Sequence, residues 1–139
     1  LATVTPASGF IGVPGGIILG ISGGIICYFS VDLIRSKLKI DDSLDVFAVH
    51  GVGGILGTLM VSFLALETFS GVGLAEEMSA NTQFLAQLFG VVLTVIWTLI
   101  FTYIALKITS LFTSLRVEEQ EEIEGLDLRS HGERAYYND

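Results

Sequence analysis

Three long stretches without a charged residue constrain this chain more than any other feature of its sequence. Asp, Glu, Lys and Arg are absent from residues 9–31, 46–66 and 78–106, which are 23, 21 and 29 residues long. About 18 mainly apolar residues suffice for a membrane-spanning helix, because about 20 residues cross a hydrocarbon core roughly 30 Å thick. The sequence therefore predicts an all-α integral membrane protein with three transmembrane helices.

Composition and motif content exclude several other classes of protein. Hydrophobic residues make up 51% of the 139, which argues against intrinsic disorder over most of the chain. The net charge of −8 has the wrong sign for a nucleic-acid partner. Cys27 is the single cysteine, so a disulfide scaffold is excluded, and we interpret it as helix filler. The sequence contains no nucleophile–base pair, phosphate loop or metal-spaced cluster, and it predicts no enzyme, metal or cofactor.

Turn and capping signals set the expected boundaries along the chain. Pro14 suits the first turn of a helix, and Asn81 and Thr82 are candidate caps for a later one. The expected order is an extracellular or re-entrant loop at 1–13, transmembrane helices at 14–38 and 42–66, an extracellular loop at 67–81, a transmembrane helix at 82–115 and an acidic cytoplasmic tail at 116–139.

The basic residues in the short loops indicate the orientation. Arg35, Lys37 and Lys39 cluster around the junction between the first two expected helices, which favours the cytoplasm for the loop there. The loop at 67–81 carries three acids and no base, as expected outside. We therefore expect a multi-pass protein of the cell membrane, with the first residue of this chain outside and its last residue in the cytoplasm.

Glycines recur at a spacing of four in the first two apolar stretches. They are Gly16, Gly20 and Gly24 in the first stretch and Gly53 and Gly57 in the second. Small residues at this spacing let transmembrane helices approach closely and gain dispersion contacts. Tight helix packing is the main interpretation, and a bare backbone lining a narrow passage is the alternative.

His50 is the titratable side chain within the apolar spans. It lies eight residues after Asp42, which corresponds to roughly 12 Å into a core of roughly 30 Å. Ionisable groups at such depth usually face a bundle interior or a polar pathway. Gly54, Gly57 and Val61 share its face by helical spacing. We interpret His50 as a transport or proton-relay residue; the alternative is a neutral imidazole bonded to a backbone carbonyl.

Acidic residues open the second expected helix. Asp42 and Asp45 have nearly the spacing of a capping box, and negative charge is favoured at a helix N-terminus. Structural capping is the main interpretation of both residues. A contribution of Asp45 to the electrostatics of a pathway through His50 stays open.

Three motifs together resemble one family of membrane proteins. Residues 41–57, which read DDSLDVFAVHGVGGILG, resemble the tenth helix of ammonium transporters of the Amt/Mep/Rh family. Residues 5–10 resemble the segment leading into that family's ninth helix. Residues 115–117, the acidic run after them, and residues 125–127 and 131–136 resemble its cytoplasmic C-terminal region.

The resemblance implies a larger protein than this chain. It implies eleven helices per subunit, built as two inverted halves, and a homotrimer with one pore in each subunit. This chain would supply the last three helices and the tail, and the remainder of the subunit would supply a first pore histidine and an aromatic gate. His50 matches the family's second pore histidine, and Val46 lies one turn earlier on the same wall.

The resemblance also implies partners for the tail. In many members this region binds PII-type signalling proteins and couples neighbouring subunits. The tail residues that fall on its motif are Gly125, Asp127, His131, Gly132 and Tyr136. Arg129 stands where plant members carry a phosphorylatable threonine, and Ser130 follows it.

The function implied is transport of ammonium or ammonia. Ammonium would lose a proton, and ammonia would pass a hydrophobic pore lined by a pair of histidines, of which this chain holds one. Two alternatives remain open at this point: a small non-conducting membrane scaffold or accessory subunit, and an ammonium sensor that signals through the tail.

Overall fold

The computed structural model describes residues 1–134 and 136, and every regular element among them is a helix. Three helices are long and apolar enough to cross a membrane: Val13–Lys37, Phe47–Leu64 and Ala80–Ser110. The predicted all-helical class with three long apolar helices is therefore confirmed.

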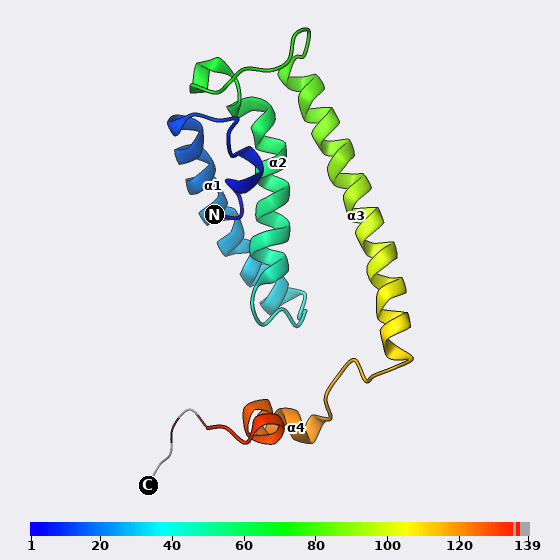
Figure 1. Cartoon of the computed structure of the whole chain (residues 1–139). Coiled ribbons are helices and arrows are strands. Elements are labelled where there is room, and N and C mark those ends of the chain that lie inside the picture. Colours follow the sequence, from blue (N-terminus) through cyan, green and yellow to red (C-terminus); the bar gives the residue numbers. More distant parts are fainter. Residues whose placement is uncertain (135, 137–139) are drawn as a thin grey trace. The chain divides into compact units, whose positions relative to one another are not determined.

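The elements follow one another along the chain without a strand among the described residues (Figure 1). Helix α1 is Val13–Asp32 and continues through a π-helical turn, Leu33–Lys37. A second π-helical turn, Phe47–Gly51, runs into α2, Val52–Leu64. Helix α3 is Ala80–Ser110 and α4 is Glu119–Glu124. The shorter elements are the 3-10 helices Thr5–Ala7 and Glu67–Phe69 and a π-helical turn at Asp127–His131.

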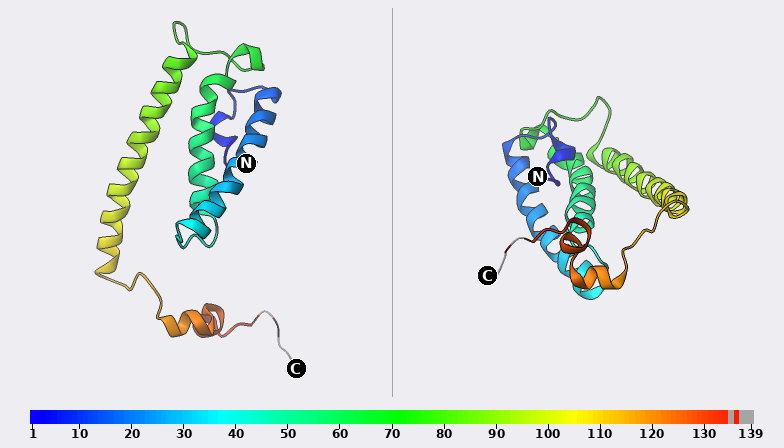
Figure 2. Two further views of the ribbon diagram at one scale, coloured as in Figure 1. Left: turned by 180° about the vertical axis from the view of Figure 1, so that it is seen from behind. Right: turned by 60° about the horizontal axis from the view of Figure 1, so that its bottom comes forward.

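The chain forms two compact units, Leu1–Val95 and Ile96–Asp139, with the division inside α3. In the first unit, α1 and α2 run antiparallel side by side (Figure 1). The N-terminal segment lies against them, as the view from behind also shows (Figure 2). The buried core of this unit consists of Ala7, Leu19, Val61, Leu64 and Ala65.

The second long helix begins at Phe47, with Val46 as its N-cap, rather than at Asp42. Asp42 stays outside the helix, and its carboxylate accepts hydrogen bonds from the N–H groups of Val46 and Phe47. Asp45 has φ of +54°, a left-handed conformation that a helix does not contain. The four residues before Val46 therefore form a capping loop, and the helix is shorter than the sequence suggested.

The bounds of the other two long helices also differ from the expected ones. Helix α1 begins at Val13, one residue before Pro14, which occupies its first turn. Helix α3 begins at Ala80, because the hydroxyl of Ser79 accepts the N–H of Thr82 at 3.1 Å and so caps the helix. The cap is thus Ser79 and neither Asn81 nor Thr82. The helix ends at Ser110, five residues before the expected end at 115.

Thr3 occupies a notch lined by glycines from both helices. A Cβ on Gly23 would lie 2.5 Å from Thr3 Oγ1, and a Cβ on Gly53 would lie 3.0 Å from the same atom. A Cβ on Gly57 would lie 2.0 Å from the carbonyl oxygen of Thr3. The start of the chain therefore lies beside the middle of α1 and α2 and not beyond their ends.

The predicted glycine stripe of the first helix has no neighbour among the described residues. A Cβ on Gly16, Gly20 or Gly24 would have no atom within 4 Å. The close contacts of α1 come instead from Gly15 and Gly23, which are buried together with Leu19. Successive helix residues differ by about 100° in direction, so a shift of one position moves the packed face to another side of the helix.

Candidate functional site

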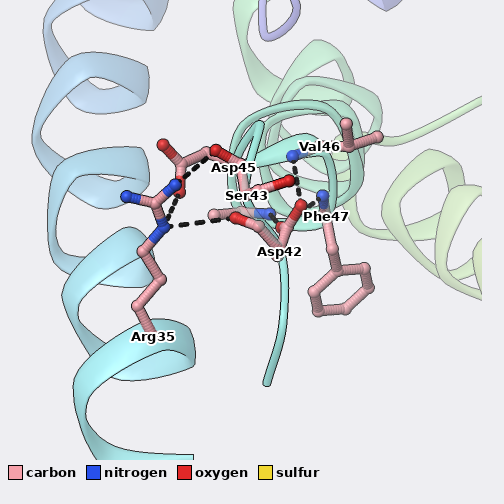
Figure 3. Close-up of polar contacts among 7 residues, drawn as sticks. Arg35, Asp42, Ser43, Asp45, Val46 and Phe47 are labelled. Atoms are coloured by element: carbon pink, nitrogen blue, oxygen red, sulfur yellow. Dashed lines mark hydrogen bonds and ion pairs between the residues drawn. The ribbon is translucent and has the colours of Figure 1, made fainter. Parts of the chain in front are cut away.

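The loop between α1 and α2 sets the start of the helix that carries His50 (Figure 3). The N–H of Val46 donates to Asp42 Oδ1 at 2.8 Å, and the N–H of Phe47 donates to Asp42 Oδ2 at 2.9 Å. The N–H of Ala48 also donates to Oδ2, at 3.4 Å. One carboxylate thus satisfies three of the amides that a helix N-terminus leaves without an intrahelical acceptor.

Asp45 does not act as the second member of a capping box. Its Oδ1 lies 2.8 Å from Nε of Arg35, which comes from the π-helical turn at the end of α1. Asp45 has φ of +54°, and none of the hydrogen bonds described for the first amides of the helix goes to its carboxylate. The capping-box interpretation of Asp45 is therefore wrong, and the residue pairs with a cation of the neighbouring helix.

The guanidinium of Arg35 also contacts the backbone of the loop. Nε donates to the carbonyl oxygen of Asp42 at 3.2 Å, and Nη2 donates to the carbonyl oxygen of Ser43 (Figure 3). The side chain of Arg35 is 44% exposed and that of Asp45 is 27% exposed. This group of contacts joins the end of one long helix to the beginning of the next.

His50 lies within the π-helical turn Phe47–Gly51 and is exposed. Its ring has no hydrogen-bond partner among the residues that the structure describes. Val46, four residues earlier, is 52% exposed, and a Cβ on Gly54, four residues later, would have no atom within 4 Å. Val46, His50 and Gly54 therefore form an open strip along this helix, which we call the His50 strip.

Gly57 and Val61 do not belong to the His50 strip. Both residues are buried, Gly57 under Thr3 and Val61 in the core. Positions 54 and 57 are three residues apart and so differ by about 60° in direction, which is enough to separate an open side from a packed one. No sequence signal predicted the π-helical turn, in which hydrogen bonds between residues five apart widen the helix. Such turns occur frequently at functional sites.

The tail residues form a short folded segment in the second unit. Arg129 follows α4 and lies near two of its acids, with Nε 3.8 Å from Glu121 and Nη1 3.6 Å from Glu124. Asp127 and His131 are the first and last residues of the π-helical turn. Gly125 and Gly132 have positive φ, +93° and +66°.

Tyr136 is 86% exposed. Ala135 and residues 137–139, the end of the expected regulatory tail, lie outside the described residues. Within the described ranges, 1–134 and 136, no group of three His, Cys, Asp or Glu side chains could hold a metal ion. The candidate site in this chain therefore consists of the His50 strip and the loop that precedes it.

Three long apolar helices, one of them carrying an exposed histidine, define an α-helical multi-pass membrane protein. The family model described as Ammonium Transporter Family matches residues 1–136. This chain belongs to the ammonium transporter family, whose members are transporters and not enzymes.

Individual relatives agree with the family assignment. The chain is 43% identical over 137 residues to "Ammonium transporter Amt1" of Archaeoglobus fulgidus, covering 98% of this chain and 34% of the relative. It is 42% identical over 139 residues to "Ammonium transporter 1" of Dictyostelium discoideum, covering 99% and 30%. It is 36% identical over 137 residues to "Ammonium transporter" of Bacillus subtilis, covering 98% and 34%. The chain thus spans about a third of the length of these curated relatives.

Proposed function

We propose that this chain forms part of an ammonium pathway, with His50 and Val46 on the wall of a hydrophobic pore. The observation that carries the proposal is the His50 strip. An imidazole stands on an apolar, membrane-length helix, and no described residue satisfies its ring nitrogens. A buried polar group without a hydrogen bond is costly in hydrocarbon, so such a ring favours a pathway or a polar partner.

The mechanism follows from the cost of moving a cation through hydrocarbon. An ammonium ion stripped of water would pay a large desolvation penalty, whereas ammonia is neutral and pays much less. Ammonium therefore gives up one proton, and ammonia passes between apolar side chains such as Val46. The ring of His50 accepts a hydrogen bond at one nitrogen and donates at the other. It pairs with a second imidazole from the remainder of the subunit, and the two rings carry the proton.

The position of this chain within a transporter is part of the same proposal. Its three long helices act as the last three of an eleven-helix subunit that assembles as a homotrimer. The three bases Arg35, Lys37 and Lys39, at the end of the first long helix and the start of the following loop, support a cytoplasmic position for that loop, with the first residue of the chain outside and the tail inside.

The tail acts as a docking segment for a PII-type protein and for the neighbouring subunit. Its sequence match at Gly125, Asp127, His131, Gly132 and Tyr136 supports this role. The short folded segment around Arg129, Glu121 and Glu124 also supports it, because a simple solvated linker needs no such contacts.

The test is His50→Ala in the protein expressed from its full native reading frame and reconstituted into liposomes. The expected result is a loss of ammonium-driven current or of selectivity for ammonium over potassium. An unchanged current and selectivity in His50→Ala would refute the pore role. A wild-type protein that moves no ammonium at all would favour the scaffold instead.

A further inference from the structure

Arg35 is the residue that ties the end of α1 to the loop in front of the His50 strip. Its Nε lies 2.8 Å from Asp45 Oδ1 and 3.2 Å from the carbonyl oxygen of Asp42. Its Nη2 donates to the carbonyl oxygen of Ser43. One side chain thus holds three positions of a loop that ends directly before Val46 (Figure 3).

The loop needs to be held because its conformation is not the one its residues prefer. Asp45 adopts φ of +54°, which is unfavourable for a residue with a side chain and persists where surrounding contacts enforce it. The contact that holds Asp45 from outside is the ion pair between its carboxylate and Arg35. The carboxylate of Asp42 accepts hydrogen bonds from the N–H groups of Val46 and Phe47. Arg35 therefore acts on the first turn of the helix through both acids.

The first turn determines where His50 points. His50 is four residues after Val46 and lies inside a π-helical turn, whose hydrogen bonds depend on which residue begins the helix. Gly53 and Gly57 of the same helix are packed against Thr3, so a change in the π-helical turn would move the residues before Gly53, His50 among them, relative to the packed part of the helix. The ring would then leave the open side on which Val46 and Gly54 lie.

We propose that Arg35 is a positioning residue for transport, which fixes the register of the His50 strip through Asp45 and Asp42. This inference rests on the proposed function, because it assigns Arg35 a part in the pore that His50 lines. The planar guanidinium suits the task, since its N–H groups donate to two carbonyl oxygens while its charge pairs with the carboxylate of Asp45. A lysine supplies the charge at a single point and cannot hold all three positions.

The experiment compares Arg35→Gln, Arg35→Lys and Lys37→Gln in the protein expressed from its full native reading frame. Lys37 belongs to the same π-helical turn and is exposed, so Lys37→Gln removes the same charge without the loop contacts. Each variant is reconstituted, its amount in the liposomes is measured, and the ammonium KM, the maximal rate per molecule and the selectivity over potassium are determined. His50→Ala is measured in parallel.

A positioning role predicts that the maximal rate changes while the KM for ammonium does not. Arg35→Gln lowers the maximal rate per molecule by about tenfold, with a fall in selectivity and an unchanged KM, because displacement of a functional group by about 1 Å costs up to a hundredfold. Arg35→Lys recovers part of the rate, and Lys37→Gln behaves as the wild type.

Two other outcomes overturn the inference in distinguishable ways. If His50→Ala impairs transport while Arg35→Gln only lowers the amount of protein and keeps rate and selectivity per molecule, Arg35 is merely structural and the pore role of His50 stands. If His50→Ala leaves transport unchanged, the proposed function and this inference fail together.

Discussion

The carbonyl oxygen of Thr3 lies 2.0 Å from the point where a Cβ on Gly57 would stand. The backbone of the N-terminal segment thus rests directly on the backbone of α2, at the middle of the helix. No side chain fits between them. This contact joins a segment that precedes α1 to a helix that follows it.

The first prediction concerns Gly57. Gly57→Ala forces a methyl group into a backbone carbonyl that cannot rotate away, so we expect a loss of about 1–3 kcal/mol of stability or a failure to fold. Gly90→Ala is the matched control, because a Cβ there meets no atom within 4 Å. Alanine also favours helix by about 1 kcal/mol over glycine in an exposed position. The measurement is the midpoint of thermal unfolding in detergent; equal midpoints for the two variants would contradict the contact.

The second prediction concerns the open glycine face of α1. No described residue covers Gly20, and the helix-packing role expected from the sequence requires a partner from elsewhere in the assembled transporter. We expect Gly20→Leu to reduce the yield of correctly assembled protein strongly, while Gly20→Ala keeps most of it. The yield is read by size-exclusion chromatography of the protein expressed from its full native reading frame. A normal yield for Gly20→Leu would show that lipid, and not protein, covers this face.

The third prediction concerns the cap at Asp42. Asp42→Ala removes the acceptor for the amides of Val46 and Phe47, and loss of such a cap costs about 0.5–2 kcal/mol. Asp42→Asn keeps one oxygen and is expected to lose less. Asp32→Asn removes an exposed carboxylate within the helix Val13–Lys37, away from the cap, and is expected to be close to neutral. Thermal unfolding of the three variants decides; an unaltered midpoint for Asp42→Ala would exclude the capping role.

The fourth prediction concerns the tail. Gly132 has φ of +66° and ψ of +17° and ends the π-helical turn, and its N–H donates to the carbonyl of Leu128. Asparagine tolerates this left-handed conformation, whereas a β-branched residue does not. We expect Gly132→Val, but not Gly132→Asn, to increase the rate at which a protease cleaves the tail. Equal cleavage rates would mean that this conformation does not stabilise the segment.

The sequence determined the class of fold and the location of the candidate site. Uncharged stretches of membrane-spanning length predict helices, because in hydrocarbon the backbone N–H and C=O groups find hydrogen-bond partners only within the chain. His50 is assigned to an apolar span because it lies within residues 46–66, which contain no Asp, Glu, Lys or Arg. The family motif then identifies the same residue without any coordinates.

The details of the site depended on neighbours that are distant in sequence. Asp45 reads as a cap from its spacing to Asp42, yet it pairs with Arg35, which lies on the other helix. The spacing rule placed Gly57 beside His50, but Thr3 covers Gly57 and leaves Gly54 open.

What the sequence alone determined is therefore the number and type of the long helices, the family, and which helix carries the histidine. Only the tertiary structure decided where that helix begins, which glycines are packed, and what Arg35 holds. The physical reason is that some of these properties depend on local composition and others on contacts between residues distant in sequence. Whether a stretch forms a membrane-spanning helix depends on the composition of that stretch alone. Packing and ion pairing depend on which surfaces the fold brings together.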